Sequence, residues 1–530
     1  MTRKMLFIRP PSLEMGSVAK KRNIHYGTIP YGMLSIITYV NKYKKNNIEL
    51  DILDLNIDPW HSYTEKELEE YIRGYIRQTQ PDVVGLSVMY NHIYPYIGKI
   101  GGLIKSVDDE IIVIAGGACI MAYYKEILQD FSCIDAIGYS EGEIPILQLL
   151  ESEDMHETLE THDSFLTKQG LLNNKKPHPL FVENLDDIPL VDFSLLDLSN
   201  YITRYTVFRP QEIENEVCLP ITTTRGCPYN CIFCIAGDIH GKKVRKASAQ
   251  KIISDVKEMI EKYGMNVLSI EDDQSLLDKV RIKEILKGIS EFELQLWMIG
   301  GFTVSLIDDE TIALLKKAGL QIATLPIESG SPYVLHEIIE KPIKLEMVPD
   351  VVKSLKKADI LCHANIIIGF PGEKEEHRQQ SVDFIKNSDI DWCYVFCATA
   401  LKGSRLYDLC ADSGYIDLKH MNIDGYCASN INTPDFTSED MTKKAYLMNL
   451  ELNFVYNNRM LKGDYHTAIL YFNHVAKKYP DHAFSHYCLA KCYENLDDGE
   501  SKAKFHSDRF YEIINNSDEW KEYAEYFELI

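Results

Sequence analysis

The sequence lacks an apolar run long enough to cross a membrane, and it lacks an excess of basic charge. Its longest apolar stretch, residues 111–124, contains a pair of glycines and is shorter than the roughly 20 residues that a transmembrane helix needs. The 530 residues include 79 acidic and 56 basic side chains, which gives a formal net charge of −23. Because such a charge repels phosphate backbones, we expect neither a membrane span nor a nucleic-acid partner.

An export signal is also missing from the first residues. The apolar run at residues 5–8 is far shorter than the core of a signal peptide, and Pro10 and Pro11 end it. We therefore expect a cytoplasmic protein whose 13 cysteines are thiols rather than disulfides. Several stand alone in apolar contexts and are predicted to be buried structural thiols: Cys119, Cys133, Cys218, Cys362, Cys410 and Cys427.

Residues 1–150 alternate short β-branched runs with helical segments. Continuous apolar runs are typical of parallel strands that are covered on both faces, so the pattern predicts an α/β, doubly wound (Rossmann-like) sheet. Ligands of such sheets bind beyond the carboxyl ends of the strands. The residues expected around that crevice are Arg9, Asn56, Ser87, Tyr90, Asn91, Gly116, Gly117, Tyr139, Glu141 and Gly142.

The remaining chain divides into three parts. Residues 151–215 are polar and turn-rich and are predicted to be a linker. Six strand–helix units follow in residues 216–430, too few for a closed eight-stranded barrel, so they predict a partial (β/α)6 barrel. Residues 440–530 are predicted to be all-α, with the spacing of a tetratricopeptide-like repeat. The alternative for this last part is a helical cap packed on the barrel.

Residues 222–234 read TTTRGCPYNCIFC and bring together Cys227, Cys231 and Cys234. Three soft thiolates indicate a metal. A structural zinc takes four ligands, and only His240 lies nearby as a fourth, whereas a 4Fe-4S cluster can be held by three cysteines with one iron left open. The basic stretch Gly241–Lys246 that follows is either a ligand contact or a solvated loop.

This C-x3-C-x2-C motif, with the aromatic Phe233 before its last cysteine, resembles that of the radical S-adenosylmethionine (SAM) superfamily. The resemblance implies that SAM chelates the open iron and is cleaved to a 5′-deoxyadenosyl radical, which abstracts hydrogen from an unactivated carbon. Acidic residues 271–273 could instead cap a helix. The residues that the resemblance assigns to SAM are Phe233, Glu271, Asp272, Asp273, Glu328, Ser329, Ile368 and Gly369.

The N-terminal region resembles the cobalamin-binding domain that is fused to many of these enzymes, on residues 31–34, Gly116-Gly117 and residues 140–143. The resemblance implies that cobalamin occupies the crevice listed above. The D-x-H-x-x-G motif that supplies an axial histidine in other cobalamin domains is absent, which leaves the cobalt ligand unassigned. Methylthiotransferases, a related class, carry three further cysteines in the N-terminal domain for a second cluster. Only Cys119 and Cys133 occur there in this sequence, so we do not expect a methylthiotransferase. The domain could also serve as a scaffold without cobalamin.

The two resemblances together imply three cofactors: a 4Fe-4S cluster, SAM and cobalamin. We expect a methyltransferase that acts on an unactivated carbon or phosphorus centre through a 5′-deoxyadenosyl radical and methylcobalamin. Two alternatives stay open, a radical cyclase or rearrangement enzyme, and a non-catalytic metal- or cobalamin-binding partner protein. The expected partners are an electron donor such as flavodoxin or ferredoxin, and a substrate that is a small molecule, a peptide or a protein.

Overall fold

Parallel strands form the centre of the N-terminal domain in the computed structural model, which describes residues 2–11, 28–57, 63–201, 208–211, 213–298, 300–418 and 429–530. Cys427 lies outside these described residues. The strands lie in the order β2-β1-β3-β4-β5-β6, and all neighbours are parallel up to β5. Their bounds are β1 Arg3–Arg9, β2 Ile48–Asp54, β3 Val83–Ser87, β4 Ile112–Gly116 and β5 Ala136–Gly138.

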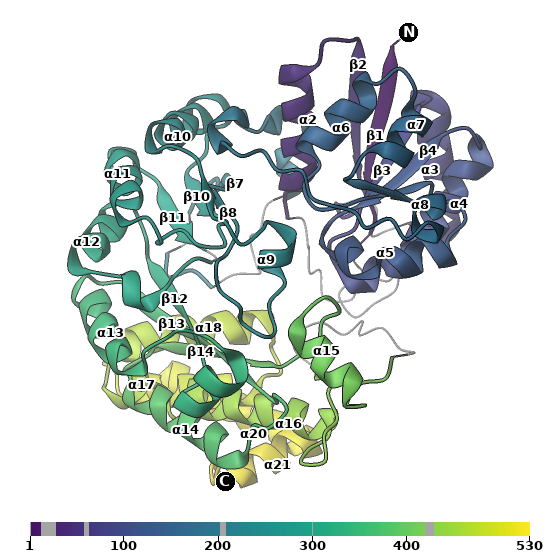
Figure 1. Ribbon diagram of the computed structural model, residues 1–530. Helices are drawn as coiled ribbons and strands as arrows, with labels where there is room; N and C mark the ends of the chain where they lie inside the picture. Colours follow the sequence, from purple (N-terminus) through teal and green to yellow (C-terminus); the bar gives the residue numbers. More distant parts are fainter. Residues whose placement is uncertain are drawn as a thin grey trace.

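Helices cover both faces of this sheet because its strands are apolar on both sides (Figure 1). In β1, Leu6 and Ile8 pack into one cluster with α3, α4 and α5, whereas Met5 and Phe7 pack into another with α2 and α6. The expected doubly wound fold is therefore confirmed. The helices are α2 Tyr31–Tyr43, α3 Glu65–Thr79, α4 Tyr94–Val107, α5 Ala118–Asp130 and α6 Glu143–Glu151.

The sheet continues past residue 150, where the sequence predicts a linker. After α7 (Met155–Thr161), strand β6 (Phe165–Thr167) pairs antiparallel with β5, and α8 (Lys168–Leu172) follows. Phe165 and Leu166 are fully buried there. A strand of three residues is too short to show a periodic pattern, which explains why the sequence gives no sign of it.

Six parallel strands form the second domain as an open arc, as a partial (β/α)6 barrel requires. The groups β11-β10-β7 and β12-β13-β14 meet at a single bridge between Leu296 and Leu320. The strands are β7 Cys218–Ile221, β10 Val267–Ile270, β11 Gln295–Met298, β12 Ile322–Glu328, β13 Leu361–Ile368 and β14 Trp392–Cys397. The outer helices are α10 Ala249–Tyr263, α11 Lys279–Ile289, α12 Asp309–Lys317, α13 Val348–Lys357 and α14 Glu375–Asn387.

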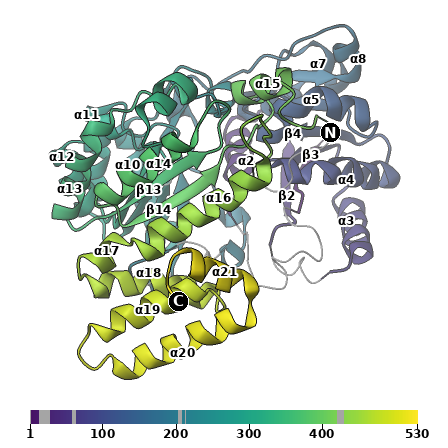
Figure 2. The ribbon, with the colours of Figure 1, turned by 90° about the horizontal axis from the view of Figure 1, so that it is seen from below.

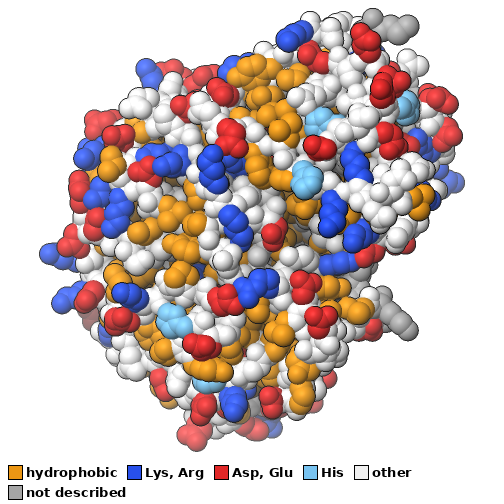
Figure 3. All heavy atoms as spheres, viewed as in Figure 1, with side chains coloured by type: hydrophobic (Ala, Val, Ile, Leu, Met, Phe, Trp, Pro, Cys, Tyr) orange, Lys and Arg blue, Asp and Glu red, His pale blue; other side chains and the backbone are white. Residues whose placement is uncertain are grey.

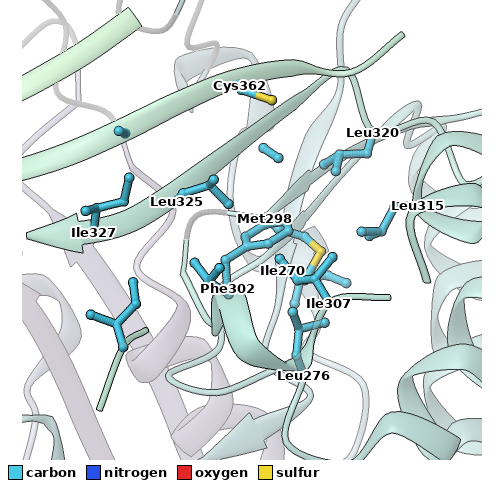
Figure 4. Packing of buried hydrophobic residues seen from close by; sticks show 14 of the residues in the cluster. Ile270, Leu276, Met298, Phe302, Ile307, Leu315, Leu320, Leu325, Ile327 and Cys362 are labelled. Atoms are coloured by element: carbon cyan, nitrogen blue, oxygen red, sulfur yellow. The ribbon is translucent and has the colours of Figure 1, made fainter. Parts of the chain in front are cut away.

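Alternate side chains of these strands face opposite sides of the arc. One set, including Ile270, Met298, Leu325 and Cys362, belongs to the large buried cluster that the outer helices complete (Figure 4). Residues that alternate with this set along a strand, such as Trp297 between Leu296 and Met298, are only partly buried. The barrel core thus lies between strands and helices, and the other strand face is left to line the inside.

The C-terminal helices pack under the last barrel strand (Figure 2). Asn453 pairs with the backbone of this strand, since its amide accepts from Cys393 N and donates to Cys393 O, both at 2.7 Å. Tyr471 stacks on Trp392 at 5.2 Å. The open edge of β14 is therefore covered. The helices are α16 Ser438–Leu450, α17 Asn458–Leu461, α18 Tyr465–Lys478, α19 Ala483–Glu494, α20 Glu500–Asn516 and α21 Asp518–Tyr526.

Two features of the whole molecule bear on its partners. Among the helices that the structure describes, none combines the length and the apolar composition that a bilayer crossing requires. On the face seen in Figure 3, basic and acidic side chains are interspersed rather than segregated.

Candidate active site

The three motif cysteines lie in a loop between β8 (Thr224–Arg225) and α9 (Ala236–Ile239). Cys227 N donates to Gly241 O at 3.2 Å, and Cys234 N donates to Cys231 O at 3.1 Å. Gly226 has a φ of +103°, and a Cβ there would lie 2.6 Å from Lys243 O. Only glycine lets the two limbs of this loop approach so closely.

The cysteine sulfurs act on one another electrostatically. Burial raises the pKa of Cys231 to about 11, and the Cys234 and Cys227 sulfurs add to this. Burial also raises the pKa of Cys234, with a contribution from Cys227. The ammonium of Lys341 opposes both shifts. Such thiols remain protonated unless a metal binds them.

This donor set fits a 4Fe-4S cluster. Cys227 and Cys231 are partly buried, and Cys234 is exposed as a residue although the surrounding protein desolvates its thiol. His240, the one candidate for a fourth zinc ligand, has its Nδ1 2.9 Å from Glu141 Oε1. Within the described ranges, no three His, Cys, Asp or Glu side chains are grouped to hold a single metal ion.

Two neighbouring segments hold the middle of the cysteine loop. Ile232 N donates to Ile339 O at 3.0 Å, and Leu406 N donates to Ile232 O at 2.9 Å. Arg405 forms two hydrogen bonds of 2.6 and 2.7 Å with Glu340. The loop is thus fixed from the end of the π-helix Val334–Ile339, which follows β12, and from α15 (Arg405–Asp412).

The acidic run after β10 has two structural members and one exposed member. Buried Asp272 accepts from Thr223 N, Thr223 Oγ1 and Thr224 N at 2.5 to 2.9 Å, and Asp273 accepts from Gly226 N at 3.1 Å. Both carboxylates hold the base of the cysteine loop. Glu271 is reached by solvent, yet the surrounding protein desolvates its carboxylate and raises its pKa.

Glu328 ends β12 with a left-handed φ of +67° at an irregularity of the strand pairing. A non-glycine residue in this conformation is strained, and such residues concentrate at functional sites. Its carboxylate accepts from Lys341 Nζ at 2.8 Å. Ser329 is fully buried, and its Oγ lies 3.2 Å from Ser381 Oγ. Glu328 therefore faces the cluster side, whereas Ser329 anchors α14.

Strand β13 ends at buried Ile368, and Gly369 follows with a φ of +88°; both residues are among those that the resemblance assigns to SAM. Gly369 N donates to Glu373 Oε2 at 2.5 Å. The ring of Phe233 lies 6.1 Å from that of Phe370, so the cysteine loop and this strand end are neighbours.

The N-terminal sheet brings its predicted loops together at one edge. Val88 N donates to Gly116 O at 2.7 Å, and Cys119 N donates to Val88 O at 3.1 Å. Gly117 has a φ of +111°, and a Cβ there would lie 2.5 Å from Val88 O. The turn after β4 therefore lies directly on the loop after β3.

Side chains at this edge differ widely in exposure. Ser87 and Asn91 are partly buried, whereas Met89 and Tyr90 are 46% and 45% exposed. Exposed side chains of this size beyond the carboxyl end of a strand offer a surface for a large ligand.

Two predicted crevice residues are engaged by the protein itself. Arg9 is buried, and its Nη1 lies 3.2 Å from Asp54 Oδ2, which also accepts from Tyr201 Oη at 2.9 Å. Tyr139 packs edge-on against Tyr124. These contacts hold the strand ends together.

Glu141 lies at the junction with the barrel rather than in open space, whereas the adjacent Gly142 packs against Ile36 and Ile146 of its own domain. Glu141 accepts from Arg245 Nη1 and Nη2 at 2.9 and 2.5 Å, and it lies 3.0 Å from Arg225 Nη1. Burial acts to raise the pKa of Glu141, but His240 and the two arginines outweigh it and lower the pKa to about 2. We therefore place Glu141 in a contact between domains.

The carboxyl edge of the N-terminal sheet thus meets the cysteine loop. Besides the Glu141 contacts, Ser140 Oγ donates to Ile239 O at 2.6 Å. Near the same junction, a Cβ on Gly403 would contact Ala122 at 3.7 Å and Ile235 at 3.9 Å. The arrangement sets the two predicted cofactor edges next to each other, as a reaction shared between them requires.

Two family models match the sequence over these regions. Residues 221–385 match the radical SAM superfamily, and residues 22–150 match the B12 binding domain. These matches define a class of cobalamin-dependent radical enzymes. The chain thus carries a radical SAM domain and a B12-binding domain, and it is an enzyme whose cofactors are a 4Fe-4S cluster, SAM and cobalamin.

Two relatives and one solved structure are similar to this chain. The chain is 28% identical over 378 residues to an uncharacterised methyltransferase of Pyrococcus horikoshii, over 70% of this chain and 79% of the relative. It is 25% identical over 427 residues to cytidylyl-2-hydroxyethylphosphonate methyltransferase of Streptomyces wedmorensis, over 74% and 79%. The fold resembles TsrM of Kitasatospora setae, a radical SAM methyltransferase solved with cobalamin and a [4Fe-4S] cluster, with a TM-score of 0.60, 16% identity, and coverage of 98% of this chain and 100% of that one.

Sequence reasoning missed several residues that shape the site. Arg245 lies in the basic stretch expected to be a ligand contact or a solvated loop, yet it is 3% exposed and paired with Glu141. Lys341 and Glu373 follow strand ends without a recognisable motif. The sequence offered one signal for the buried arginine contacts, namely Arg225, which directly precedes Gly226-Cys227 of the cysteine motif.

Proposed function

We propose that this enzyme transfers a methyl group to a carbon or phosphorus centre of a small-molecule substrate. The observation that carries the proposal is the junction of the cysteine loop with the carboxyl edge of the N-terminal sheet, through Ser140–Ile239 and Glu141–Arg245. Both of the relatives described above are named methyltransferases. When bound, the cluster supplies the electron that cleaves SAM, and cobalamin carries the methyl group.

The chain's own residues have distinct parts in this proposal. Cys227, Cys231 and Cys234 hold three irons of the cluster, and the fourth iron is left for SAM. Glu271 and Glu328 face the space beside the cluster, where a carboxylate accepts hydrogen bonds from an amino group or from ribose hydroxyls. The backbone at Ile368 and Gly369, with the Phe233 ring beside it, supports the adenine.

Lys341 is an addition to the residues expected from the sequence. Its ammonium lies 2.8 Å from Glu328 and acts on the Cys231 and Cys234 sulfurs. A cation at this position attracts the SAM carboxylate. Cobalamin is assigned to the edge formed by Ser87, Gly116 and Gly117, where Met89 and Tyr90 are exposed.

The substrate is assigned to the inside of the barrel arc, where Trp297, Asn365 and Phe396 are partly buried. An electron donor such as flavodoxin or ferredoxin is part of the proposal, as is a cytoplasmic setting, since the twelve described cysteines are free thiols. A reducing compartment keeps both the thiols and the cluster intact.

The test uses the reconstituted enzyme under anaerobic conditions with a reductant and SAM whose methyl group is deuterated. The expected result is label in the corrinoid fraction without substrate, and one labelled methyl group in the product by mass spectrometry with substrate. Formation of 5′-deoxyadenosine together with an unlabelled, rearranged product would favour a cyclase. An intact cluster with no SAM cleavage would favour a non-catalytic binding protein.

A further inference from the structure

Two arginines stand opposite each other next to the cysteine loop. Strand β8 pairs antiparallel with β9 (Arg245–Lys246), and the register sets Arg225 against Arg245. Both residues are buried, at 8% and 3% exposure. Like charges directly opposite in a two-stranded ribbon repel each other, and a buried charge without a partner is costly. The ribbon therefore needs carboxylates from elsewhere.

Those carboxylates come from the N-terminal domain. Glu143 Oε1 accepts from Arg225 Nη2 at 2.8 Å and from Ser35 Oγ at 2.7 Å. Glu141 lies 3.0 Å from Arg225 and accepts two hydrogen bonds from Arg245. In the part of the chain that the structure describes, every carboxylate that pairs with these two arginines belongs to Glu141 or Glu143.

The same ribbon fixes the start of the cysteine loop. Arg225 directly precedes Gly226 and Cys227, and the Cys227 N–H is bonded to Gly241 O. The atoms closest to a Cβ built on Gly226 are also carbonyl oxygens of the limb that leads to Arg245, those of Lys243 and Gly241. A displacement of either strand therefore displaces Cys227.

We propose that Glu141 and Glu143 of the N-terminal domain are positioning residues for the cluster: by neutralising the Arg225–Arg245 pair, they hold Cys227 where it binds iron. Cluster retention then depends on docking of the cobalamin-binding domain, whether or not cobalamin is present. The inference rests on the assignment of Cys227, Cys231 and Cys234 to a cluster, and it does not depend on methyl transfer.

The test compares Glu141→Gln and Glu143→Gln with the unmodified full-length protein. Each variant keeps the shape of the side chain but removes the charge. We expect iron release to a chelator to become faster by about tenfold or more, since loss of one partner from a buried ion pair is strongly destabilising. The electron paramagnetic resonance spectrum of the reduced cluster, with and without SAM, is expected to change its g values.

Glu126→Gln is the matched control, because Glu126 pairs with Lys402 across the same two domains but lies outside the ribbon. This variant is expected to release iron at the unmodified rate. Equal loss of iron from Glu126→Gln would overturn the proposal, because any weakening of the domain contact would then suffice.

A rescue separates charge neutralisation from a general packing defect. The double variant Glu141→Gln/Arg245→Gln removes the repelling cation together with its carboxylate, and it is expected to recover most of the iron retention that Glu141→Gln loses. Faster release from the double variant than from Glu141→Gln would contradict the inference, as would unchanged release from both single variants. If the unmodified protein itself holds no cluster after reconstitution, the cysteine assignment fails rather than the positioning role.

Discussion

The cysteine-loop edge of the barrel and the proposed cobalamin edge of the N-terminal sheet differ in the kind of side chain that each presents. At the barrel edge, polar side chains are already bonded within the protein, as in Asp273 with Gly226 N and Glu328 with Lys341. At the other edge, small residues such as Gly117 bring two loops together, and Met89 is exposed.

This difference fits the size of the ligand proposed for each edge. A cluster and the polar end of SAM need a few ligands held at defined positions, which requires support from neighbouring groups. A large flat cofactor needs an open, mostly apolar surface that the backbone shapes. We infer that substitutions of side chains affect the first edge more than the second. Substitutions of glycines that shape the backbone are expected to affect whichever edge carries them.

The largest expected effect is loss of the cluster. Cys231→Ser replaces a soft thiolate by a hydroxyl, which binds iron poorly, so we expect iron content near background and no 5′-deoxyadenosine. Iron analysis and chromatography of the reaction products measure this. Cys133→Ser, a half-buried thiol in the N-terminal domain, is the control and is expected to keep both. Retention of iron by Cys231→Ser would remove the basis of the comparison.

Sequence patterns indicate the first edge more readily than the second, for a physical reason. The cysteine motif lies within eight residues of chain, from Cys227 to Cys234, so local spacing is enough to reveal it. The β-branched runs likewise reveal both parallel sheets. Glu141 and Arg245 lie 104 residues apart, and no local pattern shows that they meet. The same holds for Asp54 and its partner Arg9, of which only Arg9 was assigned to the ligand crevice from the sequence.

A pair of glycine substitutions sharpens the comparison. Gly226→Ala sets a Cβ 2.6 Å from Lys243 O, and Gly117→Ala sets one 2.5 Å from Val88 O, each at a positive φ. We expect a cost of about 1 to 3 kcal/mol in unfolding free energy for each. Gly226→Ala is expected to lose iron and keep cobalamin, and Gly117→Ala the reverse, as measured by iron and corrinoid content.

The control for these two variants is Gly102→Ala in α4, where a new Cβ meets nothing within 4 Å. Helix propensity predicts a gain of up to about 1 kcal/mol there, with both cofactors retained. Loss of both cofactors in either test variant would mean that the two edges are not separable.

A buried carboxyl just after β13 gives the barrel edge a pH dependence. Burial raises the pKa of Glu373 to about 7 from 4.5, and its Oε1 has no hydrogen-bond partner among the described residues. The folded state therefore holds a proton that the unfolded state has lost between these pH values. Stability falls as pH rises from 4.5 to 7, by about 3 kcal/mol.

Glu373→Gln keeps the shape of the side chain and cannot ionise, so its melting temperature is expected to lack this fall. Melting curves from pH 5 to pH 8 for both proteins measure the difference. Glu376→Gln, an exposed position in the first turn of α14, which begins two residues after Glu373, is expected to follow the unmodified protein. Parallel curves for the Glu373 variant and the unmodified protein would show that this carboxyl is ionised throughout.

The smallest expected effect tests whether burial, rather than the number of hydrogen bonds, makes a contact important. Glu340 and Arg405 form two short hydrogen bonds beside the cysteine loop, as Glu141 and Arg245 do, but their side chains are 43% and 55% exposed. Water and salt screen such a pair, so Glu340→Gln is expected to cost less than about 1 kcal/mol. Its effect on iron release should disappear at about 1 M salt, where the screening length is about 3 Å. If Glu340→Gln released iron as fast as Glu141→Gln, hydrogen-bond geometry alone would account for the hold on the loop, and the buried junction would have no special part in it.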